Sequence, residues 1–219
     1  MILRDVIERA MRLNGELAAG EHPGADAMAD MITAANAMKA AWFGALIGGR
    51  LTEQAVAGAL AQAENGGEYP IPSVAFTLTA PASPRSGMRF AAVDATLDFA
   101  THNLTVDPNG RQIEGATGSL VINVDGDNRQ WWYRGDAGNW VRQAPWADEN
   151  AVVEFGDSVA AYFPYMLAVV CAAEFNTELR ADIIAGAAEG RAVMARMYAP
   201  RGRNLVEASL GAPAQLGQG

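Results

Sequence analysis

The chain has 219 residues, of which 50% are apolar and 19% charged, and its formal net charge is -9 at pH 7. A chain of this length can bury a substantial core, as one large domain or two small ones. Its one lysine, Lys39, and its scattered arginines lack the clustering that phosphate binding needs, which excludes high-affinity binding of nucleic acid. The single cysteine, Cys171, excludes an internal disulfide.

The first third of the chain has the apolar spacing of helices. Apolar residues recur at helical intervals over residues 2–13 and again over 25–46. Charged residues inside the first stretch favour an amphipathic helix over a signal peptide. We expect the glycine pair at 48–49 to end the second helix, and Thr52 to cap a third helix over 52–64.

The character of the sequence changes at Tyr69. Several prolines exclude a helix there, while Val, Thr and Phe alternate as they do in strands. Short strands separated by turn signals are expected over residues 73–79, 88–95, 95–100, 103–106, 118–124, 130–134 and 139–143. This pattern predicts a small antiparallel sandwich or barrel that ends near Pro145 and Trp146.

Helical patterns return in the last third. Residues 162–175 are apolar on nearly all sides, which predicts a buried helix with Pro164 in its first turns. Thr177 is expected to cap a final helix over 177–198.

Together these elements predict an α+β fold. A helical bundle forms from the N- and C-terminal segments, and a small antiparallel β domain, a sandwich or barrel, is inserted between them. The expected units are 1–67 and 151–199 for the helical domain, 68–150 for the β domain and 200–219 for a flexible C-terminal tail. The longest apolar run is too short to span a bilayer, so no membrane partner is expected.

Residues that could carry chemistry are few and scattered. Cys171 lies in the most apolar helix, where a cysteine is usually an inert core residue. His22 and His102 lack further ligands at suitable spacing. Asp125 and Asp127 in VDGDN fit a tight hairpin turn better than a calcium loop, because the rest of the calcium motif is missing. We therefore expect no catalytic residue, no metal and no cofactor, and a protein that is not an enzyme.

The stretch RQWWYRGDAGNW, residues 129–140, concentrates three of the five tryptophans. Strand alternation places Trp131 and Tyr133 on one face and Trp132 on the other. Trp140, in the returning strand, can pair across the hairpin with one of them. Trp132 is therefore expected to lie against the helical domain or against a neighbouring subunit, as a partner contact.

Three segments of the chain resemble phage structural proteins. In the N-terminal part, a short helix, a G-E-x-P break and an alanine-rich helix with the pattern N-x-M-x-x-x-W follow one another. This order resembles the head-to-tail adaptor (connector, or head-completion) proteins of short-tailed bacteriophages. Residues 155–198 look like the apolar helix and alanine-rich helix of that family, and residues 103–115 and 120–140 are similar to small β modules of phage proteins. The N-terminal positions that match are Gly20, Glu21, Pro23, Asn36, Met38 and Trp42.

The resemblance implies a structural virion protein at the head–tail interface, assembled in the host cytoplasm. Such adaptors form a homo-oligomeric ring, a dodecamer, beneath the portal protein, where the ring extends the DNA channel and offers a platform to tail or nozzle proteins. An acidic chain suits a channel that DNA passes without sequence-specific binding. The C-terminal tail is expected to order on a portal subunit through Arg201, Arg203, Leu205, Val206 and Leu210.

Two other functions fit parts of the sequence. A phage decoration or tail protein could present Trp132, Tyr133 and Trp140 as a platform that binds a glycan or a peptide. A hydrolase would need two acidic residues that converge in a pocket, and no spacing in the chain predicts this. The adaptor remains the main expectation.

Overall fold

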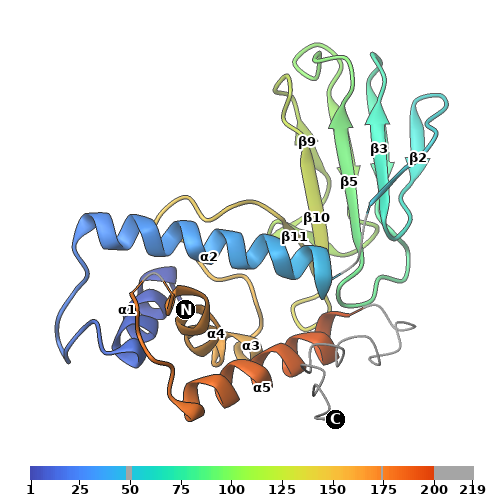
Figure 1. Ribbon diagram of the computed structural model, residues 1–219. Helices are drawn as coiled ribbons and strands as arrows, with labels where there is room; N and C mark the ends of the chain where they lie inside the picture. Colours follow the sequence, from blue (N-terminus) through green and yellow to red (C-terminus); the bar gives the residue numbers. More distant parts are fainter. Residues whose placement is uncertain (48–50, 174, 200–219) are drawn as a thin grey trace, which may run out of the picture.

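The computed structural model describes residues 1–47, 51–173 and 175–199. Helices from both ends of the chain pack into one body, and the β part rises from one end of it (Figure 1). The α+β fold with inserted strands is therefore confirmed. The helices are α1 (Leu3–Asn14), α2 (Ala25–Ala45), α3 (Asp157–Ala160), α4 (Phe163–Cys171) and α5 (Ala181–Tyr198).

Helix α4 lies at the centre of the helical body. It packs against α1, α2, α3 and α5, and its Phe163 and Leu167 are fully buried, as its apolar sequence predicted. Pro164 falls in the first turn, where its missing N–H would have no intrahelical partner. Asn14, at the end of α1, donates from Nδ2 to the Ala168 carbonyl of α4 at 3.1 Å.

Two glycines bring α5 close to α4. A Cβ on Gly190 would lie 2.6 Å from Cβ of Tyr162, just before α4. A Cβ on Gly186 would lie 2.7 Å from Cδ1 of Tyr165. The absence of side chains at these two positions therefore sets the distance between the helices.

The β part consists of two sheets of short strands. One has seven strands in the order β1-β3-β5-β10-β11-β7-β8, and the other has four in the order β2-β4-β6-β9. The strands are β1 (Thr52–Glu53), β2 (Leu60–Gln62), β3 (Gly67–Ile71), β4 (Phe76–Thr79), β5 (Arg89–Asp94), β6 (Leu104–Asp107), β7 (Gln112–Ile113), β8 (Ala116–Thr117), β9 (Leu120–Ile122), β10 (Arg129–Arg134) and β11 (Asn139–Arg142). An apolar core that includes Phe90, Leu104 and Trp131 fills this part.

From β1 to β6, successive strands alternate between the two sheets. Each strand thus pairs with one that is two places away in the chain, and these pairings (β1–β3, β3–β5, β2–β4 and β4–β6) are parallel. The pairings β5–β10, β10–β11 and β6–β9 are antiparallel. The sheets are therefore mixed and not purely antiparallel as predicted, because side-chain alternation reveals a strand but not the direction of its neighbour.

The predicted helix over 52–64 is wrong. The segment forms β1 and β2, which pair with β3 and β4, and Gly58 between them has a left-handed φ of 77°. Apart from Val56 and Leu60, the apolar residues of this segment are alanines, so it has little apolar surface to bury against a helical core. The helix predicted to end at Gly48 and Gly49 ends at Ala45, and those two glycines lie outside the described residues.

Two smaller predictions also fail. Residues 95–100 form turns instead of a strand, because the carboxylate of Asp94 accepts the backbone N–H groups of Asp98 and Phe99. Thr177 does not cap α5, which begins at Ala181. The Thr177 hydroxyl donates instead to the carboxylate of Glu16, in the loop after α1.

Candidate functional site

The hairpin of β10 and β11 divides its aromatic residues between two cores. Trp131, Tyr133 and Trp140 lie in the core of the β part, and Tyr133 is the cross-strand partner of Trp140. Trp132 belongs to the core of the helical body. The alternation predicted from the sequence is therefore confirmed.

Trp132 is fully buried beneath helices of its own chain. Its ring centroid lies 5.5 Å from Phe43 of α2 and 5.0 Å from Tyr198 of α5. Trp132 was expected to lie against either the helical domain or a neighbouring subunit. It lies against the helical part, and it is not exposed for contact with another subunit. The platform for a glycan or peptide is not on the surface either, since Trp140 is fully buried and Tyr133 is 5% exposed.

Arg89 ties β5 to the end of α2. Its Nη1 donates to the Phe43 carbonyl at 2.8 Å and to the Ile47 carbonyl at 3.1 Å. Carbonyls at a helix C-terminus lack intrahelical partners and attract a cation. Burial lowers the pKa of Arg89 to about 10, so the side chain stays charged at neutral pH. Sequence reasoning missed this residue.

Lys39 ties α2 to the segment that follows β11. Its Nζ donates to the Ala144 carbonyl at 2.6 Å, forms an ion pair with Glu154 and lies 4.3 Å from the centroid of the Trp146 ring. Burial lowers the pKa of Lys39, against the opposing effect of the Glu154 carboxylate. Asn36, one turn earlier, exchanges two hydrogen bonds with the Trp146 backbone. The sequence feature that could have predicted the burial of Lys39 is its position at helical spacing among apolar residues.

Tyr198 is the third tie, at the last residue of α5. Its hydroxyl accepts the Gly156 N–H at 3.0 Å, and burial raises the pKa of this hydroxyl. Its carbonyl lies against the turn before β5, where a Cβ on Gly87 would be only 1.7 Å from the Tyr198 oxygen. Gly87 has a φ of +83° and donates its N–H to the Tyr133 carbonyl of β10 at 2.9 Å. The two parts of the chain are therefore joined at several buried points.

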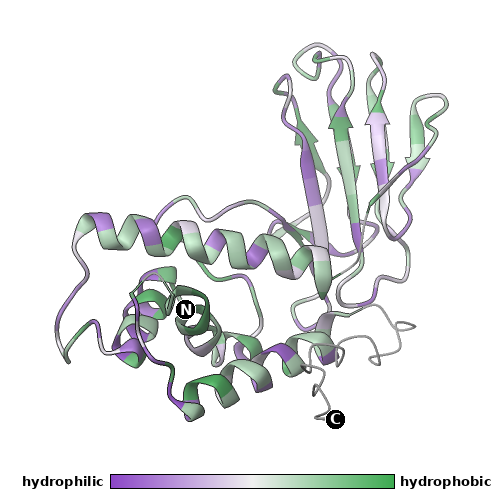
Figure 2. Ribbon diagram, viewed as in Figure 1, coloured by the Kyte–Doolittle hydropathy of each residue, from purple (hydrophilic) through white to green (hydrophobic). Residues whose placement is uncertain are grey.

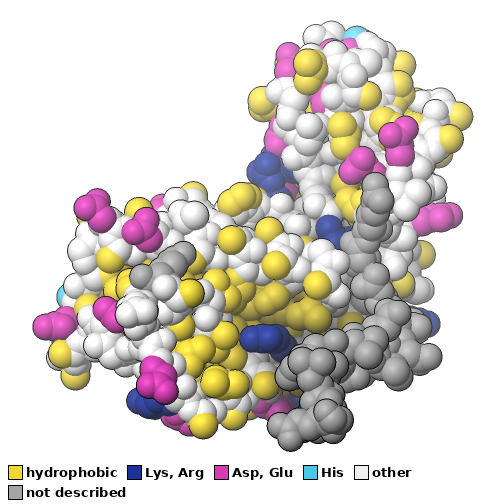
Figure 3. Space-filling model, in the orientation of Figure 1, with side chains coloured by type: hydrophobic (Ala, Val, Ile, Leu, Met, Phe, Trp, Pro, Cys, Tyr) yellow, Lys and Arg dark blue, Asp and Glu magenta, His cyan; other side chains and the backbone are white. Residues whose placement is uncertain are grey.

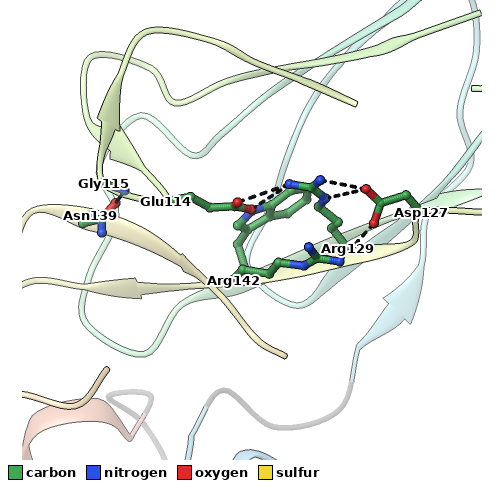
Figure 4. Close-up of polar contacts among 7 residues, drawn as sticks. Glu114, Gly115, Asp127, Arg129, Asn139 and Arg142 are labelled. Atoms are coloured by element: carbon green, nitrogen blue, oxygen red, sulfur yellow. Dashed lines mark hydrogen bonds and ion pairs between the residues drawn. The ribbon is translucent and has the colours of Figure 1, made fainter. Parts of the chain in front are cut away.

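A charged network lies beside the β10–β11 hairpin (Figure 4). Arg129 bridges Glu114 and Asp127, and Arg142 from β11 reaches the second oxygen of Asp127 at 3.0 Å. The bonds from Arg129 hold the pKa of Asp127 below its ordinary value. Glu114 also accepts the indole N–H of Trp131 at 2.9 Å. Each charge in the network has a partner of opposite sign, so the network stabilises the hairpin.

The carboxylates of the β part hold loops in place. Burial alone would raise the pKa of Asp94, but the backbone N–H groups of Gly126, Asp98 and Phe99 keep it below its ordinary value. The VDGDN segment is thus a turn folded over Asp94, with Gly126 at a φ of 74°. Within residues 1–47, 51–173 and 175–199, no three His, Cys, Asp or Glu residues come together as a metal site.

The carboxylate of Asp98 is hydrogen-bonded to two hydroxyl groups and one imidazole. Its Oδ2 is bonded to Ser73 Oγ and lies 2.9 Å from Nδ1 of His102, while Thr96 donates to its Oδ1 at 2.6 Å. These hydrogen bonds, of which the one from Ser73 has the largest effect, hold the pKa of Asp98 below its ordinary value. Ser73 and His102 share one carboxylate oxygen, which is not the serine–histidine contact that activates a nucleophile. The cluster organises a loop at the tip of the β part.

The remaining sequence candidates lie apart from one another. Cys171 is fully buried at the end of α4, and His22 contacts Glu8 of α1 at 2.7 Å. The predicted partner contacts at Arg201, Arg203, Leu205, Val206 and Leu210 lie outside the described residues.

A hollow of the described surface lies at the end of α5. This cavity, of about 300 Å³, is lined from the β part by Asn65, Arg85 and Ser86, and on the other side by Arg196 of α5 and by Ala199, which follows the helix. In the view of Figure 3, apolar side chains gather between α2 and α5. Ala199 therefore lies where both parts meet, next to the exposed Arg85 and Arg196.

The comparisons with known proteins add no assignment. No family model and no curated protein matches the chain. Among solved structures, a chain of a chaperone–substrate complex is similar at 15% identity and a TM-score of 0.29, over 40% of this chain and 14% of that chain. Among the described helices, none is both long and apolar enough to cross a bilayer.

Proposed function

We propose that this chain is a head-to-tail adaptor of a tailed bacteriophage. Its copies form a ring beneath the portal, extend the DNA channel and offer a platform to tail or nozzle proteins. The order of the parts carries the proposal: helices of both chain ends form one body, strands are inserted between them, and α5 leads into the C-terminal segment. This is the order that the sequence resemblance implies.

The rigid junction supports a role in a ring. A ring closes only when each subunit presents its two contact surfaces at a fixed angle, because contacts between unlike surfaces otherwise generate open filaments. Buried contacts of Trp132, Arg89 and Lys39 join the helical and β parts, so every copy presents its surfaces in the same relative position. No metal or cofactor is needed for such a role.

The charge of the chain is compatible with a DNA conduit. The net charge is -9, and the described arginines are largely paired with carboxylates, as Arg129 and Arg134 are. A surface without clustered free cations does not hold DNA through phosphate neutralisation. DNA can therefore slide past it.

Electron microscopy of the purified chain mixed with the portal protein of the same phage tests the proposal. We expect a ring of this chain on the portal for the full chain, and none for a chain that ends at Tyr198. The shortened chain should unfold at the same temperature as the full one, since Tyr198 and its buried contacts remain. A full chain that leaves the portal bare, or a shortened chain that still binds, contradicts the proposal.

A pair of charge reversals refines the test. Arg201→Glu combined with Arg203→Glu should weaken binding to the portal. Arg111→Glu, an exposed position in the turn before β7, is the matched control and should bind normally. Equal binding by both variants would show that the two tail arginines do not contact the portal.

A further inference from the structure

The four-stranded sheet has two unpaired edges, β2 and β9. Figure 1 shows these strands at opposite sides of the β part, and Figure 2 shows β9 coloured as apolar. Leu60 on β2 is 74% exposed and Val121 on β9 is 51% exposed. An edge strand presents backbone N–H and C=O groups that another strand can pair with.

Both edge strands are short, but two other protections of sheet edges, charged residues and proline, are missing from them. Proteins blunt exposed edges with charged residues, especially lysine, and with proline. Residues 54–63 around β2 and 115–124 around β9 contain no Asp, Glu, Lys, Arg or Pro. In a chain with a net charge of -9, these two neutral edges are places where copies can approach without repulsion between carboxylates.

Leu60 and Val121 lie in one cross-strand row. Leu60 is paired with Thr77 of β4, Thr77 with Thr105 of β6, and Thr105 with Val121 of β9. The two exposed apolar side chains therefore stand at opposite ends of the same row. A neighbouring copy placed beside the sheet at the same height brings its Leu60 next to Val121.

Strand direction favours this contact as well. Strands β2, β4 and β6 are parallel, and β9 is antiparallel to β6, so β9 runs opposite to β2. A rotation axis roughly along the strands preserves the direction of each strand in every copy. Pairing of β9 with β2 of the next copy is then antiparallel, the commoner kind of strand pairing.

We propose that β9 of one copy pairs with β2 of the next, with Val121 opposite Leu60, and that this pairing joins neighbours in the ring. The inference rests on the proposed adaptor function for the ring itself. It names the surface and the partner, a second copy of this chain, through which the ring closes.

Cysteine cross-linking tests the pairing. Opposite residues of antiparallel strands have Cβ atoms close enough for a disulfide. The double variant Leu60→Cys/Val121→Cys should form a ladder of covalent oligomers on oxidation, both alone at high concentration and on the portal. Leu60→Cys and Val121→Cys as single variants should stay uncross-linked, and an equal mixture of the two should give dimers only.

A second variant tests the edge contact without a covalent cross-link. Val121→Lys places a charge at the contact, and we expect it to weaken assembly by about tenfold or more while leaving the unfolding temperature unchanged. Val74→Lys, at an exposed valine outside the strands, is the matched control and should assemble normally.

The outcomes separate the two proposals. A ring on the portal that forms with Val121→Lys, or without the cross-link ladder, overturns the edge pairing and leaves the adaptor function standing. Dimers of Val121→Cys alone overturn it too, because they show that β9 pairs with β9. If Val121→Lys loses binding to the portal but still self-assembles, the edge pairs with a strand of the portal and the proposed pairing between copies is overturned. A ladder without any ring on the portal supports the edge pairing and contradicts the adaptor function. If neither a ladder nor a ring forms, both proposals are contradicted.

Discussion

Replacing Gly87 with alanine should break the contact between the end of α5 and the β part. The added Cβ would lie 1.7 Å from the carbonyl oxygen of Tyr198, so the helix end must move by at least about 1 Å to restore an ordinary contact. Tyr198 cannot move without disturbing its edge-on contact with the Trp132 ring and the hydrogen bond that it accepts from Gly156. The substitution therefore loosens a contact that joins the two parts.

The size of the effect follows from two separate costs. Gly87 has a φ of +83°, and an alanine in left-handed backbone costs roughly 1–2 kcal/mol. Overlap in a packed site adds roughly 1–3 kcal/mol. Gly110 is the matched control, because its φ is +74° but no atom lies within 4 Å of an added Cβ. We therefore expect a loss of roughly 2–5 kcal/mol for Gly87→Ala and roughly 1–2 kcal/mol for Gly110→Ala.

Urea unfolding followed by tryptophan fluorescence measures both variants. The free energy of unfolding should fall further for Gly87→Ala, and hydrogen exchange at the end of α5 should speed up in that variant only. Equal losses in the two variants would refute the contact, since the difference between them reports the overlap with Tyr198 alone.

Three further predictions concern the buried contacts. Trp132→Ala should lower the free energy of unfolding by about 3–5 kcal/mol, measured by urea unfolding, because the ring is fully buried; a near-neutral effect would contradict that burial. Gly190→Ala should lower the melting temperature through its clash with Tyr162, while Gly44→Ala, in open space on α2, should raise it slightly; shifts of the same sign would contradict the close helix contact. Asp94→Asn should cost about 1–3 kcal/mol near neutral pH. Since the folded pKa of Asp94 is lowered, its contribution is present above about pH 4 and lost as pH falls through that pKa, so variant and wild type should converge in acid unfolding experiments.

The sequence predicted the elements that bury a continuous apolar face. Helices α1, α2 and α4 lie where apolar residues recur at helical spacing, and α4 is buried because it is apolar on most sides. The two faces of the β10–β11 hairpin were likewise predictable, because strand alternation assigns Trp131 and Trp132 to opposite sides whatever surrounds them.

The segment 52–64 shows where this reasoning fails. Its many alanines favour a helix locally, yet they offer almost no apolar surface for a helix to bury. Pairing with β3 and β4 satisfies the backbone instead, through strands that are two places away in the chain. Such a pairing depends on how the chain crosses between two sheets, and no local pattern of residues encodes that path.

Arg89 shows the same limit for the junction. In the sequence it stands at the start of a strand, where a charged residue is ordinarily exposed. Its burial depends on the last turn of α2, where Phe43, 46 residues earlier in the chain, has a carbonyl oxygen without a helical partner. The carbonyls of Phe43 and Ile47 replace part of the water that the guanidinium loses on burial, so its position requires both the strand and the helix end to be in place. Residues that join two parts of a fold can therefore be recognised only when the structures of both parts are known. The angle between the parts depends on these residues.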